Sequence, residues 1–170
     1  MTGESAAPPM LPGLRDPGNR VSRRAIGYWT ARAVLDGVWL LAAESAVAAG
    51  LGLWTLLWIM LGVTAAGIAC YAVIMPRWRY RVHRWEVTAD AVYTRTGWLS
   101  VHWRIAPLGR IQTIDSHRWF GERLFGLANV TATTASAAGP VHIRGLDSAT
   151  ADRLLDELTV ATGRLPGDAT

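Results

Sequence analysis

The sequence contains no lysine, only one cysteine and, over one long stretch, no charge at all. All 17 basic residues are arginine. A preference for bidentate contacts with phosphate or carboxylate would account for this, and so would a G+C-rich genome. The many alanine and glycine residues favour the genomic explanation. The lone Cys70 excludes a disulfide within the chain. Because it lies in an apolar run, we expect it to be a small packing residue and not a reactive thiol.

The uncharged stretch covers residues 54–75 and leads into Pro76 and a group of arginines. About 20 apolar residues cross a bilayer as a helix, so this stretch predicts a transmembrane helix. A second apolar segment, residues 32–49, precedes it and contains Asp36 and Glu44. A carboxylate costs up to about 3 kcal/mol at the centre of a membrane helix, so the first segment inserts poorly alone. We therefore expect a two-helix transmembrane hairpin over residues 28–76.

Arginines precede and follow the predicted hairpin and are absent from its turn at residues 50–53. By the positive-inside rule, both termini then face the cytoplasm. The pI of about 10 does not indicate a nucleic-acid partner, because the arginines gather at the ends of the predicted membrane helices, where topology explains them. Residues 1–27 are rich in proline and glycine and predict a disordered tail without the apolar core of a signal peptide. Residues 164–170 form a second tail.

The periodicity becomes strand-like from residue 80 onwards and predicts an antiparallel β-structure. The predicted strands cover residues 85–88, 91–96, 98–105, 110–115, 128–134 and 140–144, with a turn or helical corner at 121–126. A helix follows, capped by Asp147 or Ser148. Its apolar face is formed at helical spacing by Ala151, Leu154, Leu155 and Leu158. Together these patterns predict a small curled sheet or barrel with one opening covered by the helix.

Several short motifs resemble one known family. They are Trp85-Glu86-Val87-Thr88, Thr96-Gly97-Trp98-Leu99, the run from Ile105 through Pro107 and Arg110 to Asp115, and Arg123 through Gly126-Leu127-Ala128 to Val130. In this order, after a membrane hairpin, they resemble the bacterial pleckstrin-homology-like (PH-like) domain of small membrane proteins over residues 28–160. The resemblance implies a seven-stranded PH-like barrel with a C-terminal helix over residues 77–163. It also implies no enzymatic activity and a protein partner, although a fold does not fix a function.

No catalytic group, cofactor or metal site is expected from the sequence. The glycines at 121 and 126 lack the Lys-Ser/Thr that a phosphate-binding loop requires. The histidines lie singly, without the spacing of metal ligands. They are His83, His102, His117 and His142.

Polar residues near the membrane are the first candidate sites. Asp36 and Glu44 either belong to an ion pathway or a contact with a basic partner helix, or have local partners, with Asp36 pairing with Arg32 and Glu44 facing the other helix. The arginines after the hairpin either bind anionic lipid headgroups, at roughly 1 kcal/mol each, or only set the topology. These candidates are Arg77, Arg79, Arg81 and Arg84.

Small residues recur every four positions on both helices and are the candidate helix-packing positions. They are Ala42, Ala46 and Gly50 on the first helix and Gly62, Ala66 and Cys70 on the second. They pack either within the hairpin or between copies of the chain.

The predicted function is that of a non-enzymatic protein of the bacterial inner membrane, which presents a cytoplasmic PH-like domain as an assembly module for another membrane protein or for itself. The alternatives are a sensor of anionic lipid headgroups and a small channel subunit that uses the two carboxylates.

Overall fold

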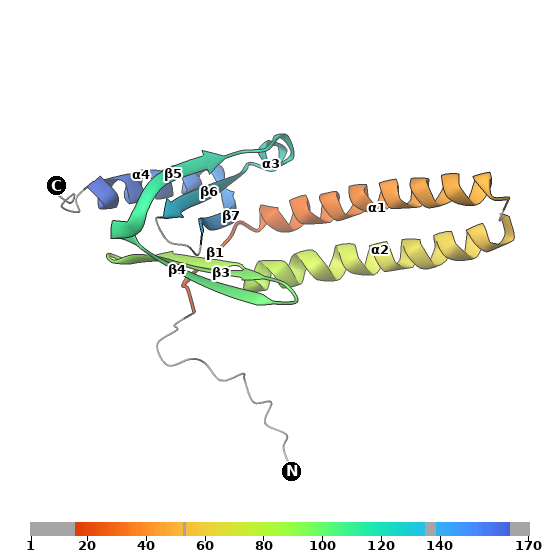
Figure 1. Ribbon diagram of the computed structural model, residues 1–170, viewed down its shortest axis with the longest axis horizontal. Coiled ribbons are helices and arrows are strands. Elements are labelled where there is room, and N and C mark those ends of the chain that lie inside the picture. Colours follow the sequence, from red (N-terminus) through yellow and green to blue (C-terminus); the bar gives the residue numbers. More distant parts are fainter. Residues whose placement is uncertain (1–15, 53, 135–138, 164–170) are drawn as a thin grey trace, which may run out of the picture.

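A computed structural model describes residues 16–52, 54–134 and 139–163. Two long helices, α1 (Arg24–Gly50) and α2 (Trp54–Val82), form an antiparallel hairpin that projects from one end of a β-domain (Figure 1). The domain has a four-stranded sheet, β1-β2-β3-β4, and a three-stranded sheet, β5-β6-β7, with antiparallel pairing throughout. The elements of the domain are β1 (Asn19–Arg20), β2 (Arg84–Val87), β3 (Ala91–Gly97), β4 (Val101–Pro107), a 3₁₀ turn (Leu108–Arg110), β5 (Ile111–His117), α3 (Phe120–Leu124), β6 (Leu127–Thr134), β7 (Val141–Asp147) and α4 (Ser148–Gly163).

The two hairpin helices are long and apolar enough to cross a membrane. Only 17% of the most apolar stretch of α1 and 11% of that of α2 is buried inside the molecule. The core helix of a water-soluble protein buries most of its apolar side chains, whereas here large side chains such as Trp39 and Trp58 are exposed. The apolar surface of the hairpin is therefore suited to contact with lipid.

The contact between α1 and α2 is made by one face of each helix. Gly37 lies against Ile68 so closely that a Cβ atom on the glycine would be 2.5 Å from the Ile68 side chain. Further along, Thr64 Oγ1 donates a hydrogen bond of 3.3 Å to Glu44. The buried members of this interface are Ala33, Gly37 and Ala48 of α1 and Leu57, Ala72 and Met75 of α2.

Helix α2 continues through Pro76 to Val82, beyond the end predicted from the sequence, and Tyr80 lies in this helix and not in a strand. A proline lacks the N–H that would bond to the carbonyl four residues earlier, which here is that of Ala72. Thr30 of α1 donates its hydroxyl to this carbonyl at 3.4 Å. A neighbouring helix thus supplies the donor that the proline removes, which allows the helix to extend past it.

The chain enters the β-domain before it forms the hairpin. Strand β1 pairs with β2, with Asn19 opposite Trp85, so the hairpin is inserted between two neighbouring strands of one sheet. The Gly18 amide also donates to Glu86 at 2.9 Å. Residues 16–27, predicted as part of a disordered tail, are therefore ordered. The local sequence could not show this because a two-residue strand is specified by its distant partner. The rest of both predicted tails lies outside the described residues.

The hydrophobic core of the domain lies between the two sheets and α4. The apolar stripe predicted on α4 is confirmed, with Leu154 and Leu158 fully buried and Leu155 half-buried. They pack against side chains such as Val92, Leu108 and Ile143. The architecture predicted from the sequence is confirmed: a long helical hairpin, antiparallel sheets and a closing helix.

A second, smaller core joins the hairpin to the domain. Its buried members are Val21, Ala25, Trp29 and Leu127. Gly145 of β7 has φ +77°, and a Cβ atom there would lie 3.1 Å from that of Ala25. The amide of Ser22 donates to the Gly145 carbonyl at 2.8 Å. Helix α1 therefore begins inside the domain's own packing and not at the end of a loose linker.

Candidate functional site at the base of the hairpin

A cavity of about 1080 Å³ lies at the base of the hairpin, where α1, α3 and the sheet of β5, β6 and β7 meet. Helix α1 contributes Arg32 and Asp36, α2 contributes Arg79, and β7 contributes His142 and Arg144. Exposed aromatic side chains of the α3 corner complete its wall. The cavity thus combines several basic groups with an apolar rim.

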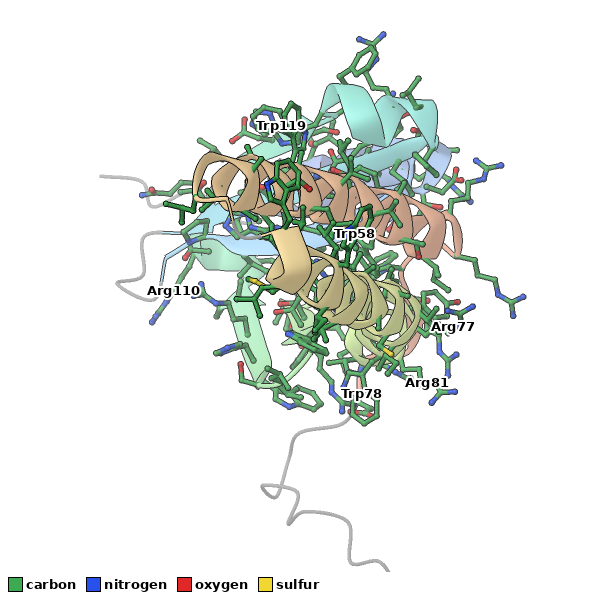
Figure 2. All side chains as sticks on the ribbon, turned by 90° about the vertical axis from the view of Figure 1, so that its right-hand side faces the viewer. Trp58, Arg77, Trp78, Arg81, Arg110 and Trp119 are labelled. Atoms are coloured by element: carbon green, nitrogen blue, oxygen red, sulfur yellow. The ribbon has the colours of Figure 1, made fainter. Side chains whose placement is uncertain are left out.

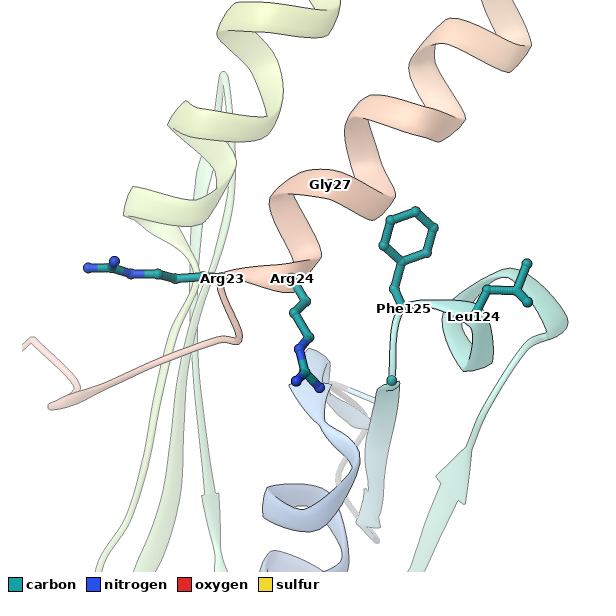
Figure 3. A pocket seen from close by; sticks show the side chains of 6 residues that line it. Arg23, Arg24, Gly27, Leu124 and Phe125 are labelled. Carbon is teal, nitrogen blue, oxygen red and sulfur yellow. The ribbon is translucent and has the colours of Figure 1, made fainter.

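The α3 corner is held against α1 by aromatic packing. The rings of Phe125 and Tyr28 meet edge-on, with 5.8 Å between their centroids. Phe125 points towards the turn of α1 that contains Gly27 (Figure 3), where a Cβ atom would lie 3.3 Å from the ring. On the far side of Phe125 a smaller groove of about 610 Å³ is bounded by Arg23 and Arg24. Because Arg24 is bound to Asp147 at 3.0 Å, this groove offers fewer free charges than the cavity.

The buried carboxylate of Glu122 has a structural role. It accepts hydrogen bonds from the Trp119 amide at 3.0 Å and from the Asn129 side chain at 2.7 Å. Asn129 in turn accepts a hydrogen bond of 2.9 Å from the amide of Gly145. This chain of bonds ties α3 to β6 and β7, so the carboxylate is engaged in holding the cavity wall.

Three arginines from different elements face the cavity. The guanidinium carbon of Arg79 lies 4.5 Å from the ring centroid of Trp29, and its Nε lies 3.4 Å from Nε2 of His83. Arg32 lies 3.8 Å from Asp36, both of them exposed. Within the part of the chain that the structure describes, neither Arg79 nor Arg144 has a carboxylate within 4.0 Å. The cavity therefore carries positive charge that the described residues do not neutralise.

The histidines beside these arginines are held neutral. Burial, assisted by the charges of Arg79 and Arg144, lowers the pKa of His83 to about 4. Its Nδ1 lies 2.9 Å from the Arg79 carbonyl, to which it donates when the ring is neutral. Partial burial and the charges of Arg144 and Arg104 also lower the pKa of His142. Among residues 16–52, 54–134 and 139–163 there is no cluster of three or more His, Cys, Asp or Glu side chains that could hold a metal.

Of the four arginines predicted as headgroup contacts, Arg79 alone lines the cavity. Lipid contact by the other three stays a prediction. Arg77 and Arg81 lie on the same side of α2 in the view along the helices (Figure 2), and Arg77 donates to the Val73 carbonyl of its own helix at 2.7 Å. Arg84 lies 3.4 Å from the Pro17 carbonyl. Sequence reasoning missed Arg144 as a member of the site, because it lies in a strand far along the chain and no local pattern connects it with α2.

The carboxylates of the hairpin lie apart. Asp36 forms the ion pair with Arg32 and lines the cavity. Glu44 faces α2, where Thr64 donates to one of its oxygens, while its other oxygen is buried and has no hydrogen-bond partner among the described residues.

The predicted small-residue positions face away from the hairpin contact. All six are exposed: Ala42, Ala46, Gly50, Gly62, Ala66 and Cys70. A Cβ atom at Gly50 or Gly62 would meet nothing within 4 Å. Packing within the hairpin is therefore not their role, since Gly37 and Ile68 make that contact. Packing between copies of the chain stays a prediction.

Comparison with known protein families supports the identification of the fold. The family model for the bacterial PH domain matches residues 33–161, which cover most of the hairpin and extend into α4. Such domains are generally non-catalytic. No curated protein and no solved structure matches the chain.

Proposed function

Because this chain belongs to the bacterial PH domain family, we propose that it is a non-enzymatic inner-membrane protein whose PH domain binds the phosphate of an anionic lipid at the base of its hairpin. One observation carries the proposal. Arg32, Arg79 and Arg144 converge on one cavity. Arg32 is paired with Asp36, whereas Arg79 and Arg144 have no carboxylate partner among the described residues. An anion from outside the chain would supply the missing charge.

The position of the cavity suits a lipid headgroup. The uncharged run of residues 54–75 extends for about 33 Å as a helix, close to the thickness of the hydrocarbon core. The cavity lies at the end of this run, where Arg79 follows it. With both termini in the cytoplasm, as the arginine distribution predicts, the cavity opens at the inner leaflet. Anionic lipids there attract basic residues with roughly 1 kcal/mol each.

The chemistry of the cavity suits a phosphodiester with an attached glycerol. Guanidinium groups bind phosphate oxygens through paired hydrogen bonds, and the stacking of Arg79 on Trp29 orients its planar group. The exposed aromatic residues at the rim, Trp119 and Phe120, offer apolar surface to the glycerol and the upper acyl chains.

The test compares arginines inside and outside the cavity. The full-length protein is placed in nanodiscs of mixed phosphatidylglycerol and phosphatidylcholine, and the lipids that remain bound on extraction are quantified by native mass spectrometry. Arg144→Gln should remove the enrichment of phosphatidylglycerol, whereas Arg81→Gln, outside the cavity, should leave it unchanged. Equal losses in both variants would show non-specific attraction and overturn the proposal. Displacement by added glycerol phosphate would identify a free phosphate ester as the ligand instead of a lipid.

Assembly between membrane helices is the second candidate function, and the outward position of the small residues favours it. On both helices these residues leave an open strip on the lipid-facing side, where another helix can approach closely. Cys70 lies on this strip and is exposed, so oxidation in native membranes should join two copies through it. Ala66→Leu should weaken this crosslink. Affinity purification in mild detergent would reveal a different membrane partner, and a protein recovered alone and uncrosslinked would rule out assembly.

A further inference from the structure

The tip of the β3–β4 hairpin lies alongside a membrane helix. The ring of Trp98 meets that of Tyr71 edge-on, with 5.8 Å between the centroids and 88° between the planes. Tyr71 belongs to the uncharged run of α2, four residues before Met75. The next residue of the tip, Leu99, is 83% exposed. Figure 1 shows the end of this β-hairpin reaching past the base of α2.

A second apolar tip lies beside α1. The α3 corner exposes Trp119 at 71%, Phe120 at 77% and Leu124 at 72%. Its glycine, Gly121, lies so close to α1 that a Cβ atom there would be 3.1 Å from the Tyr28 ring. In Figure 1 the two tips flank the base of the helical hairpin and reach a similar level along it.

The depth of both tips follows from the register of the helices. Tyr71 lies about 6 Å inside the end of the uncharged run, at roughly 1.5 Å per residue. Thr30 donates to the Ala72 carbonyl and therefore lies level with Ala72. Tyr28, two residues before Thr30, lies only about 3 Å nearer the domain than Ala72. Trp119 and Phe120 line the cavity at the base of the hairpin together with Tyr28. Both tips are therefore level with the headgroup region and the first carbons of the acyl chains.

We propose that these two tips insert into the cytoplasmic leaflet on either side of the hairpin and hold the PH domain in a fixed orientation against the membrane. The tips are formed by Trp98 and Leu99 on one side and by Trp119, Phe120 and Leu124 on the other. The occupant of this surface is the lipid interface itself, because the tips continue the lipid-facing surface of α1 and α2. Tryptophan and leucine are favoured at that depth, and their exposure to water would be unfavourable. The proposal rests on the membrane-spanning hairpin of the proposed function and not on phosphate binding.

Depth-dependent quenching tests this proposal in the full chain. In a Cys70→Ala background, single cysteines are introduced as Leu99→Cys, Leu124→Cys and, as a control, Val160→Cys, which replaces an exposed apolar residue of α4. Each is labelled with a small fluorophore and reconstituted in phosphatidylcholine vesicles, which carry no net anionic charge. The labels at 99 and 124 should be quenched several-fold more by a nitroxide on the lipid near the headgroup than the label at 160. A water-soluble quencher should give the opposite order.

A further variant separates this proposal from the hairpin on which it rests. Trp58→Cys replaces an exposed side chain of α2 four residues from the other end of the uncharged run, and it should be quenched by a nitroxide on the lipid near the headgroup. If position 58 responds to lipid quenchers but positions 99 and 124 are quenched from water like position 160, the hairpin spans the membrane and the insertion of the tips is wrong. Shielding of 99 and 124 from both quenchers would show that another protein chain covers them and would also overturn the proposal.

Discussion

The guanidinium group of Arg79 is stacked on the indole ring of Trp29, 4.5 Å from the ring centroid to the guanidinium carbon. The two residues belong to different helices, so the contact joins α1 and α2 where the hairpin leaves the domain. The His83 ring packs on the same indole, with 5.4 Å between the centroids. This stack therefore connects both helices and the start of β2 and positions one of the three arginines of the cavity.

We expect Arg79→Gln to destabilise the protein by about 1–2 kcal/mol, because a partly desolvated cation–π contact is lost. Thermal unfolding in mild detergent measures the effect. Arg81→Gln, on the exposed side of the same helix, is the control and should have little effect. Equal stability of the two variants would show that the stack does not hold the base of the hairpin together.

Gly145→Ala is expected to destabilise the junction of hairpin and domain by about 2 kcal/mol. The residue has φ +77°, which is unfavourable for alanine, and its Cβ atom would press on that of Ala25 at 3.1 Å. The matched control is Gly67→Ala in α2, where a Cβ atom meets nothing within 4 Å. That change should be neutral or slightly stabilising, since alanine favours helices. Chemical unfolding of both variants distinguishes the two positions.

Stability should fall on acidification because of His83. Its pKa is about 4 in the folded protein and takes the ordinary histidine value of 6.5 in the unfolded chain, so between these values the unfolded chain binds a proton that the folded chain does not. The free energy of unfolding should be independent of this group above pH 6.5, decrease by about 3 kcal/mol between pH 6.5 and 4, and remain level below. His83→Gln should remove most of this dependence. A pH profile of His83→Gln that falls as steeply as that of the unmodified protein would contradict this role of His83.

Glu44→Leu is expected to favour membrane insertion of α1 by about 2–3 kcal/mol, because the carboxylate lies opposite Thr64 in the middle of the hairpin. Insertion of the segment Arg24–Gly50 in a translocon assay measures this. Asp36→Leu should give a smaller gain, since Asp36 is paired with Arg32 of its own helix. Equal gains would show that the ion pair does not lower the cost of inserting Asp36.

Much of the fold follows from local patterns. The uncharged run of residues 54–75 predicts a membrane helix, the alternation after it predicts most of the strands, and the stripe from Ala151 to Leu158 predicts α4. These elements are readable because hydrophobic periodicity acts over neighbouring residues. The motifs around Pro107 and Gly126 identified the family for the same reason, since they lie at turns that the fold requires.

The features that depend on distant contacts arise only in the folded protein. Strand β1 exists because β2 offers it a partner, and α2 passes Pro76 because Thr30 of another helix serves the Ala72 carbonyl. The convergence of Arg79 and Arg144, and the position of Trp98 beside Tyr71, arise only when the sheets fold against the base of the hairpin. Local composition sets which segments are apolar and how they repeat. Which side chains meet was decided by packing between segments that lie far apart in the chain.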